Sequence, residues 1–324
     1  MRRQRVVHLL AVGCLFVLFA ARLSADEAEL PAWAASTIPR AETYEKNRAD
    51  KEYAEKVRPN MPDEAFVKPA ETRRLLIFHN PHNYRHTAEI PLRRAVVEMG
   101  EKTGAYTATV TDDPAVFTPE KLAEFDAVFF SNVNNAGNLG IGLPDDKGAQ
   151  ALMGYVATGG GWVGNHASIQ SLAPCKPFPE MVGGIFMWHP FATNETILKN
   201  ETPDSPFTAA YGSDPVPCRD EIFTIKSPPF SREKQQVLLS IDWECSARAR
   251  EIAAKLREEN ENPFALREDN DYAVSWVKPY VKGRVFYTSL GHAHETIADP
   301  RFLKHMLAGI QYAIGDLPPL GPRG

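Results

Sequence analysis

The sequence predicts an α/β fold in which a mainly parallel sheet carries helices on both faces. Between residues 73 and 168, short apolar runs of strand length alternate with longer stretches of helical periodicity. Several of the runs stay apolar at successive positions, as strands buried on both faces do. Repeated strand–helix–strand order implies right-handed crossovers between parallel strands, with helices on both faces of the sheet.

The first unit of this pattern begins with RLLIFHN, Arg74 to Asn80, an apolar run that ends in polar residues. A helix is expected over Ala88 to Lys102, because apolar side chains recur there at helical spacing and Gly104 follows as a terminator. The next run, YTATVTDD from Tyr106 to Asp113, is predicted to be the second strand.

Two more units follow. Thr118 and Pro119 are typical of a helix start, with threonine as the cap and proline in the first turn. The third strand is predicted in DAVFFSNV, residues 126–133, and the third helix over Asp145 to Ala157. GWVGNH, residues 161–166, is the fourth predicted strand, with a turn or helix at Ser168.

The pattern loosens after residue 190, where some strands are expected to be antiparallel. SARAREIAAKLREEN, residues 246–260, predicts a charged, solvated helix. Pro300 to Ile314 predicts a final helix with one apolar face. The remaining runs are predicted as strands: TNETILKN (193–200), DEIFTIKS (220–227), QVLLSID (236–242), YAVSWVKPY (272–280) and GRVFYTSLGH (283–292).

The organisation expected along the chain is a signal peptide over residues 1–25, an extension over 26–70 and one domain over 71–318. Arginines, a long apolar stretch and a small-residue site before Asp26 are typical of a secretory signal. An uncleaved anchor is the alternative, because the apolar stretch approaches spanning length. We therefore expect an exported chain, periplasmic or extracellular, without stable membrane insertion after cleavage. Residues 26–70 show only a short helical pattern, around Glu42 to Val57.

Charge and cysteine content narrow the classes of function. Removal of the signal leaves 32 basic against 41 acidic residues, which argues against a nucleic-acid partner. Cys175, Cys218 and Cys245 remain, without zinc-finger spacing or a context that indicates a catalytic thiolate. One disulfide among them is permitted in an exported chain. The sequence predicts no oligomeric state.

The segment GGGWVGNHAS, Gly159 to Ser168, has the form of a nucleophile elbow in which histidine takes the central position. Ligands of parallel sheets gather at the carboxyl ends of the strands. His79 and His166 each end a predicted strand, so both are expected at that edge. An imidazole presented there suits a general base or a metal ligand. The alternative is a glycine-rich crossover in which His166 only caps a helix.

Other histidines and acids strengthen the functional interpretation, because histidines in loops point to proton transfer or to a divalent metal. Asp220 and Glu221 lie together in RDEIF. His305 falls within the last predicted helix and is expected to be structural. The other histidines of the mature chain lie in predicted loops or at strand ends: His79, His82, His86, His166, His189, His292 and His294.

Taken in order, several motifs between residues 73 and 316 resemble the ThuA-like, or trehalose-utilisation, family. The resemblance implies the flavodoxin-like fold of class I glutamine amidotransferases. Those enzymes hold a cysteine nucleophile at the elbow, and His166 stands there in this chain, which excludes thiol amidotransferase chemistry. The motifs are YRHTAEI (84–90), GGGWVGNHAS (159–168), VGGIFMWHP (182–190), DEIF (220–223), AVSWVKPYVKGRVFYTSLGH (273–292) and DPRFLKHMLAGIQYAIG (299–315).

The same resemblance implies a role in carbohydrate catabolism, in some systems beside dehydrogenases that produce 3-keto-glycosides. Two departures from the family pattern are Phe223, where relatives often have tyrosine, and an apparent insertion over 246–270 that could reshape a rim. The motif residues carried over to this chain are His86, His166, His189, Glu221 and His292.

The site predicted from these residues combines acid–base chemistry with a metal. His166 is the expected base and Glu221 its acid or orienting partner, with His86 as a further catalytic residue. His86, His189 and His292 are the expected ligands of a divalent cation, zinc or manganese. No nucleotide cofactor is expected. The predicted substrate-binding residues are Trp188, Asn165 and Arg85.

The function expected is an exported enzyme acting on a sugar or an oxidised glycoside, with a small-molecule sugar as its partner. A 3-keto group acidifies the neighbouring C–H, so a base could take that proton while an acid helps the glycosidic oxygen leave. Two alternatives stay open: a non-catalytic carbohydrate-binding or scaffold module of a cell-envelope sugar system, and a metal-dependent hydrolase of another substrate. Convergence of the motif residues in one pocket would argue against the binding module.

Overall fold

Five parallel strands form the centre of the sheet: the four that the sequence predicts between residues 73 and 168, and a fifth from near the end of the chain. The computed structural model describes residues 53–191, 195–259, 262 and 265–319. The parallel strands are β1 (Arg74–Phe78), β2 (Thr107–Thr111), β3 (Ala127–Phe130), β4 (Gly161–Asn165) and β11 (Gly283–Thr288). They lie in the order β2-β1-β3-β4-β11. This order is the flavodoxin-like one, and it confirms the predicted fold class.

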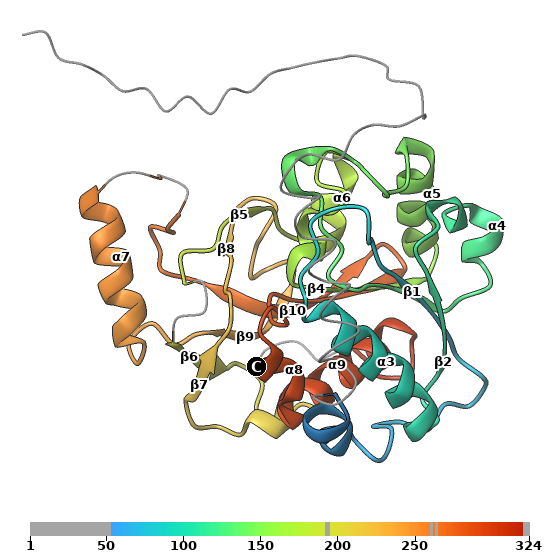
Figure 1. Ribbon diagram of the computed structural model, residues 1–324, viewed down its shortest axis with the longest axis horizontal. Helices are drawn as coiled ribbons and strands as arrows, with labels where there is room; N and C mark the ends of the chain where they lie inside the picture. Colours follow the sequence, from blue (N-terminus) through green and yellow to red (C-terminus); the bar gives the residue numbers. More distant parts are fainter. Residues whose placement is uncertain (1–52, 192–194, 260–261, 263–264, 320–324) are drawn as a thin grey trace, which may run out of the picture. The chain divides into compact units, whose positions relative to one another are not determined.

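Antiparallel strands extend the sheet beyond β11. They are β10 (Ala273–Tyr280), β9 (Gln236–Ile241), β6 (Glu195–Asn200) and β7 (Val216–Arg219), in that order. The described part of the chain thus contains a mixed sheet of nine strands (Figure 1). The antiparallel strands expected after residue 190 are confirmed.

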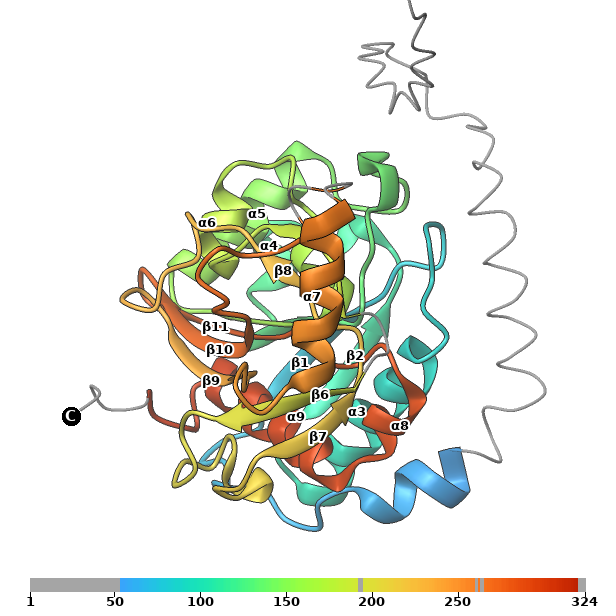
Figure 2. The same ribbon diagram turned by 90° about the vertical axis from the view of Figure 1, so that its left-hand side faces the viewer.

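Helices cover both faces of the sheet (Figures 1 and 2). On one face lie α3 (Glu89–Thr103), α8 (His294–Ala298) and α9 (Pro300–Ala313), and on the other α4 (Pro119–Leu122), α5 (Asp146–Ala157) and α6 (Pro177–Val182). Side chains of β1 alternate between two apolar clusters, because successive strand residues point to opposite faces. Leu75 and Ile77 join the first cluster, and Leu76 and Phe78 join the second.

The predicted helix ends are confirmed. Thr118 caps α4 by accepting a hydrogen bond from the Lys121 N–H, and Asp145 caps α5 through Gly148. Gly104 ends α3 in the left-handed conformation, with φ of +67°. The charged helix α7 (Ala247–Glu259) forms as expected, buries Ala249 and Ala253, and lies against β6.

One predicted strand is largely wrong. Of residues 220–227, only Thr224–Ile225 form a strand, β8, which pairs with β5 (Phe186–Trp188) in a separate two-stranded sheet. The preceding residues form a loop, because the Asp220 carboxylate binds backbone N–H groups of a distant loop. A local apolar pattern does not indicate such a long-range contact.

The N-terminal predictions fall mostly outside the described residues. This holds for the signal peptide and for most of the expected helix over Glu42 to Val57. Its described end, Tyr53–Val57, is a π-helical turn whose Tyr53 and Val57 join the core. Within the described ranges, no helix has the length and apolar character that crossing a bilayer requires. Cys175, Cys218 and Cys245 are free thiols.

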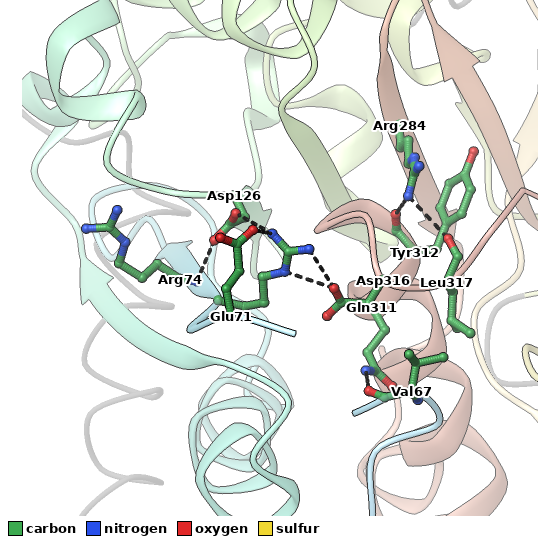
Figure 3. Close-up of polar contacts among 10 residues, drawn as sticks. Val67, Glu71, Arg74, Asp126, Arg284, Gln311, Tyr312, Asp316 and Leu317 are labelled. Carbon is green, nitrogen blue, oxygen red and sulfur yellow. Dashed lines mark hydrogen bonds and ion pairs between the residues drawn. The ribbon is translucent and has the colours of Figure 1, made fainter. Parts of the chain in front are cut away.

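An arginine network ties the amino end of the sheet to the end of the chain. The Arg73 guanidinium contacts Asp316 Oδ1 at 2.7 Å, Glu71 at 2.8 Å and Asp126 at 3.2 Å. Asp126 also accepts a hydrogen bond from the Arg74 N–H. Figure 3 draws these contacts beside those of Gln311, whose side chain binds the backbone of Val67. The network joins β1, the segment before β3 and the residues after α9.

We expect Arg73→Met to lower the free energy of unfolding by about 3 kcal/mol, because it leaves a buried carboxylate without its cation. The Asp316 side chain is only 4% exposed. Urea unfolding followed by circular dichroism measures the change. The control is Arg248→Met in the exposed Arg248–Glu251 pair, which should cost less than about 1 kcal/mol. Equal losses in the two variants would contradict the structural role of Arg73.

Candidate metal centre and active site

Four side chains meet at the carboxyl ends of the parallel strands. His86 lies in the loop after β1, His166 directly follows β4, and His292 follows β11. Glu221 comes from the loop between β7 and β8. Each residue offers one potential ligand atom, and these atoms all lie within 4.8 Å of one another. Chain segments far apart in sequence therefore build one compact group.

The backbone at His166 has the strained geometry of an elbow. His166 is fully buried and has φ of +46°, a left-handed conformation that costs free energy for a residue with a Cβ. The Tyr287 hydroxyl donates a hydrogen bond to the His166 carbonyl at 2.8 Å. At Gly164 a Cβ would lie 2.1 Å from the Trp162 ring, so the approach to the elbow requires glycine. These contacts fix the backbone from which the imidazole projects.

The His166 ring is oriented by a hydrogen bond to a backbone carbonyl. Its Nδ1 lies 3.0 Å from the Ser289 carbonyl, so Nδ1 carries the proton and donates. In the neutral ring, the other nitrogen, Nε2, presents a lone pair. Nε2 lies 3.2 Å from Glu221 Oε2 but has no hydrogen-bond partner among the described residues. Metal-binding histidines are commonly held in this way, with the non-ligating N–H on a carbonyl.

His86 and His292 share this unsatisfied state. The buried Nδ1 atom of each has no hydrogen-bond partner within the described ranges. Ring centroids lie 4.7 Å apart for His86 and His166, and 5.2 Å apart for His86 and His292. Burial, together with the neighbouring imidazoles, holds the pKa of His86 well below its ordinary value, and burial also lowers the pKa of His292. Both rings are therefore neutral at pH 7, as ligation requires.

Glu221 supplies the negative charge of the group. Burial opposes its ionisation, but the close approach of His166 and the neighbouring His189 and His292 rings outweigh burial, so its pKa lies below the ordinary value. Its side chain is only 12% exposed. No lysine or arginine is among the described residues that line the cavity around it. A buried carboxylate among imidazoles is favourable for a cation.

Asp220 positions two parts of this group at once. Its fully buried carboxylate accepts hydrogen bonds from the N–H groups of Gly291, His292 and Ala293 at 2.8 to 3.1 Å. It also accepts from the N–H of Glu221 at 2.9 Å. The loop that carries His292 and the loop that carries Glu221 are thus joined through one side chain.

The group opens into a cavity of about 430 Å³, a volume typical of small-molecule sites. Phe223 packs on His166 with ring centroids 4.5 Å apart, and Phe186 packs on Phe223. His189 lies at the cavity with its Nδ1 3.2 Å from Glu221 Oε1. The lining residues are Tyr84, His86, Asn134, Ala136, Gly137, His166, Ala167, Gln170, Phe186, His189, Glu221, Phe223 and His292.

Comparisons with known proteins agree with this architecture. The ThuA family model, described as trehalose utilisation, matches residues 74–313. The chain belongs to the ThuA family. A ThuA-like protein structure from Bacteroides uniformis matches with a TM-score of 0.56 and 16% identity, covering 76% of this chain and 94% of the other. One from Parabacteroides merdae matches with a TM-score of 0.52 and 13% identity, covering 76% and 91%. No curated protein matches.

The five residues that the motif resemblance singles out converge in this chain. His86, His166, His189, Glu221 and His292 all line the one cavity. The four-residue group differs from the expected ligand set: it contains His166 and Glu221 beside His86 and His292, and it does not contain His189. The sequence could not rank these histidines, since their mutual distances depend on how the loops fold.

The predicted substrate-binding residues do not line the cavity. Arg85 is buried and pairs with Glu89 at 3.3 Å. Asn165 is fully buried, and its Oδ1 accepts a hydrogen bond from the Asn132 N–H at 2.8 Å. Trp188, at the end of β5, is 41% exposed and stacks on His189 with centroids 4.9 Å apart. Only Trp188 therefore presents a face beside the cavity.

His79 and His305 have simpler outcomes. His79 follows β1 but is not among the described cavity residues, and burial lowers its pKa to about 4. His305 is buried between Ser275 and the Phe207 carbonyl, each at 2.8 Å, and has the structural role expected of it.

Sequence reasoning missed the residues that support the site. Asp220 was noted beside Glu221, but nothing local indicated that it binds a loop 71 residues away. Asn132 and Asn134 lie in the turn after β3, and asparagine is so common in turns that the signal was not distinctive. Their place after a buried parallel strand was the available clue.

A divalent cation fits the residues present. Three histidines and one carboxylate are an ordinary ligand set for zinc or manganese. A tetrahedral zinc shell separates ligand atoms by about 3.3 Å. The group, with all its atoms within 4.8 Å, needs only a modest contraction to reach that spacing. The unpartnered ring nitrogens supply the donors.

We expect Asp220→Asn to lower the free energy of unfolding by about 2–4 kcal/mol, because the new amide N–H₂ would face backbone donors where a carboxylate oxygen now accepts. Thermal and urea unfolding measure the loss. The matched control is Asp113→Asn at an exposed helix cap, where asparagine is an equally good cap. If Asp220→Asn were as stable as this control, Asp220 would not hold the two loops together.

Proposed function

We propose that this protein is a metal-assisted enzyme that acts on a sugar or a 3-keto-glycoside by acid–base chemistry. The observation that carries the proposal is the convergence of three buried imidazoles and one carboxylate in a single cavity, with three ring nitrogens that have no hydrogen-bond partner among the described residues. Leaving such atoms unsatisfied costs free energy that a bound cation would recover.

In this proposal His86, His166, His292 and Glu221 hold the cation. A zinc or manganese ion bound there would polarise a carbonyl or hydroxyl oxygen of the substrate. The Ser289 carbonyl holds His166 in the tautomer that exposes Nε2, and Asp220 fixes the backbone of His292 and Glu221. In this proposal His166 is a metal ligand and not the base expected from the sequence, because its ligand atom belongs to the four-residue group.

His189 is then the group available to move a proton. It is 38% exposed, so its ring can reach a substrate, and its Nδ1 lies 3.2 Å from Glu221 Oε1, which orients the ring. With a 3-keto-glycoside, His189 takes the proton from C2, the electrons form the C1=C2 bond, and the C1–O bond breaks. The imidazolium returns its proton to the departing oxygen, so an enone and an alcohol result.

A sugar is the proposed substrate because of the family and the walls of the cavity. The family description is trehalose utilisation. Phe186, Phe223 and Tyr84 line the cavity, and Trp188 offers an exposed ring at its edge. Aromatic faces suit the apolar faces of sugar rings.

The convergence favours an enzyme over the binding module, since binding alone does not need buried imidazoles around a carboxylate. A metal-dependent hydrolase of another substrate would use the same ligands, and the substrate assay separates the two. Export is also part of the proposal, on the signal-like residues 1–25.

We expect the purified protein to bind about one equivalent of zinc or manganese per chain, and His166→Ala and His292→Ala to retain less than about a tenth of it, since each removes a ligand. Equilibrium dialysis followed by elemental analysis measures the metal. His82→Ala is the control, because His82 is exposed and lies in the same loop as His86. Equal metal content in wild type and both ligand variants would refute the metal centre.

We expect His189→Ala to reduce kcat with a 3-keto-glucoside by about 10²- to 10⁴-fold, the range typical of a lost acid–base group. Its metal content should stay at the wild-type level, because His189 lies outside the ligand group. A coupled assay of product release gives kcat, and His82→Ala is again the control. A kcat within threefold of wild type would remove His189 from the chemistry, and loss of metal would make it a ligand.

A further inference from the structure

The loop after β3 contains several buried asparagines, and the side chains of two of them form hydrogen bonds within the fold. Asn132, at φ of +50°, accepts a hydrogen bond from the Ala167 N–H through its side chain. Asn135 donates from Nδ2 to the Ser171 carbonyl at 2.9 Å and accepts from the Gly140 N–H at 2.9 Å. These contacts tie the loop to the elbow segment and to the following turn.

Asn134, between them, is different. It is 5% exposed, yet its Oδ1 is buried and has no hydrogen-bond partner among the described residues. It also lines the cavity that contains His166 and Glu221. Buried side-chain amides are nearly always satisfied, so an unpartnered one at a cavity wall calls for a ligand. The terminal torsion of asparagine is soft, so a small rotation presents either the oxygen or the nitrogen.

The chemistry of the wall narrows what Asn134 would bind. An amide offers one acceptor and two donors, which matches a hydroxyl group that both donates and accepts. Gln170 adds a second amide to the lining. The described lining contains no lysine or arginine and one carboxylate, Glu221. A phosphate or a carboxylate on the substrate would therefore find no fixed cationic side chain there.

We propose that Asn134 is a specificity-determining residue, which binds a hydroxyl group of an uncharged, polyhydroxylated substrate within this cavity. The proposal rests on the proposed function, because it assigns the substrate contact of the same site. Asn135 makes the contact effective: both polar atoms of its side chain hold the loop, so Asn134 is positioned before the substrate arrives. A site built to bind a hydroxyl strongly rejects an analogue that lacks it.

The test compares Asn134→Ala with Asn135→Ala in the metal-loaded protein. Oδ1 of Asn134 accepts no hydrogen bond from the described residues, so Asn134→Ala breaks none there. Its Tm should therefore stay within about 2 °C of wild type. Its kcat/KM for methyl 3-keto-glucoside should fall about tenfold, mainly through KM, the size expected for one lost hydrogen bond. Asn135→Ala should instead lower Tm clearly, because it leaves the carbonyl of the fully buried Ser171 without its partner and removes the contact that holds Gly140.

A second arm tests the charge of the substrate. Wild type should prefer methyl 3-keto-glucoside over its 6-phosphate by at least tenfold in kcat/KM. Asn134→Ala should leave that preference largely intact, because the preference comes from the absence of lysine and arginine among the described lining residues. Turnover of the phosphate equal to or faster than that of the neutral sugar would overturn the substrate class.

The outcomes separate the two proposals. If wild type turns over the neutral sugar and Asn134→Ala does so with unchanged KM and kcat, the role of Asn134 is refuted and the proposed function stands. If Asn134→Ala lowers Tm as much as Asn135→Ala does, Asn134 has a structural role and its proposed role in substrate binding is refuted. If calorimetry shows that wild type binds neither sugar and kinetic assays show that it turns over neither, the proposed function fails and this inference fails with it.

Discussion

The buried carboxylate of Asp220 is the interaction on which the site depends. It gathers the N–H groups of three successive residues after β11 and the N–H of Glu221. Without it, the loop of His292 and the loop of Glu221 would each have to find its position separately. A buried carboxylate that lost these hydrogen bonds would cost free energy, so the contacts of Asp220 hold the two loops together. The parallel strands supply His86 and His166 to the same edge.

The sequence predicted the central fold well because local patterns determine it. Apolar runs, the Thr118 and Asp145 caps and the Gly104 terminator are all readable within a few residues. The loop over 220–223 was missed because a contact with the distant residues 291–293 overrides the local pattern. Long-range hydrogen bonds of this kind leave no periodic signal.

The members of the candidate site could be predicted, but their arrangement could not. Motif resemblance brought together His86, His166, His189, Glu221 and His292, and one cavity contains them. Which imidazoles share a ligand group is a question of distances of a few ångströms, and His189 differs from His166 only at that scale. Arg85 and Asn165 were expected to contact the substrate only because each stands beside a motif histidine in the sequence. In the structure, both side chains make contacts within the fold: Arg85 pairs with Glu89, and Asn165 accepts a hydrogen bond from Asn132.

The strand order explains why the cavity has two kinds of wall. In the order β2-β1-β3-β4-β11, the direction of winding reverses between β1 and β3, so the loops after these two strands diverge to opposite faces and leave a crevice. His86 comes from the first of these loops and Asn134 from the second. The imidazoles and Glu221 form the wall suited to a cation, and the asparagine loop forms a neutral, hydrogen-bonding wall. A substrate bound in this crevice would therefore have its reacting oxygen at one wall and its hydroxyl groups at the other.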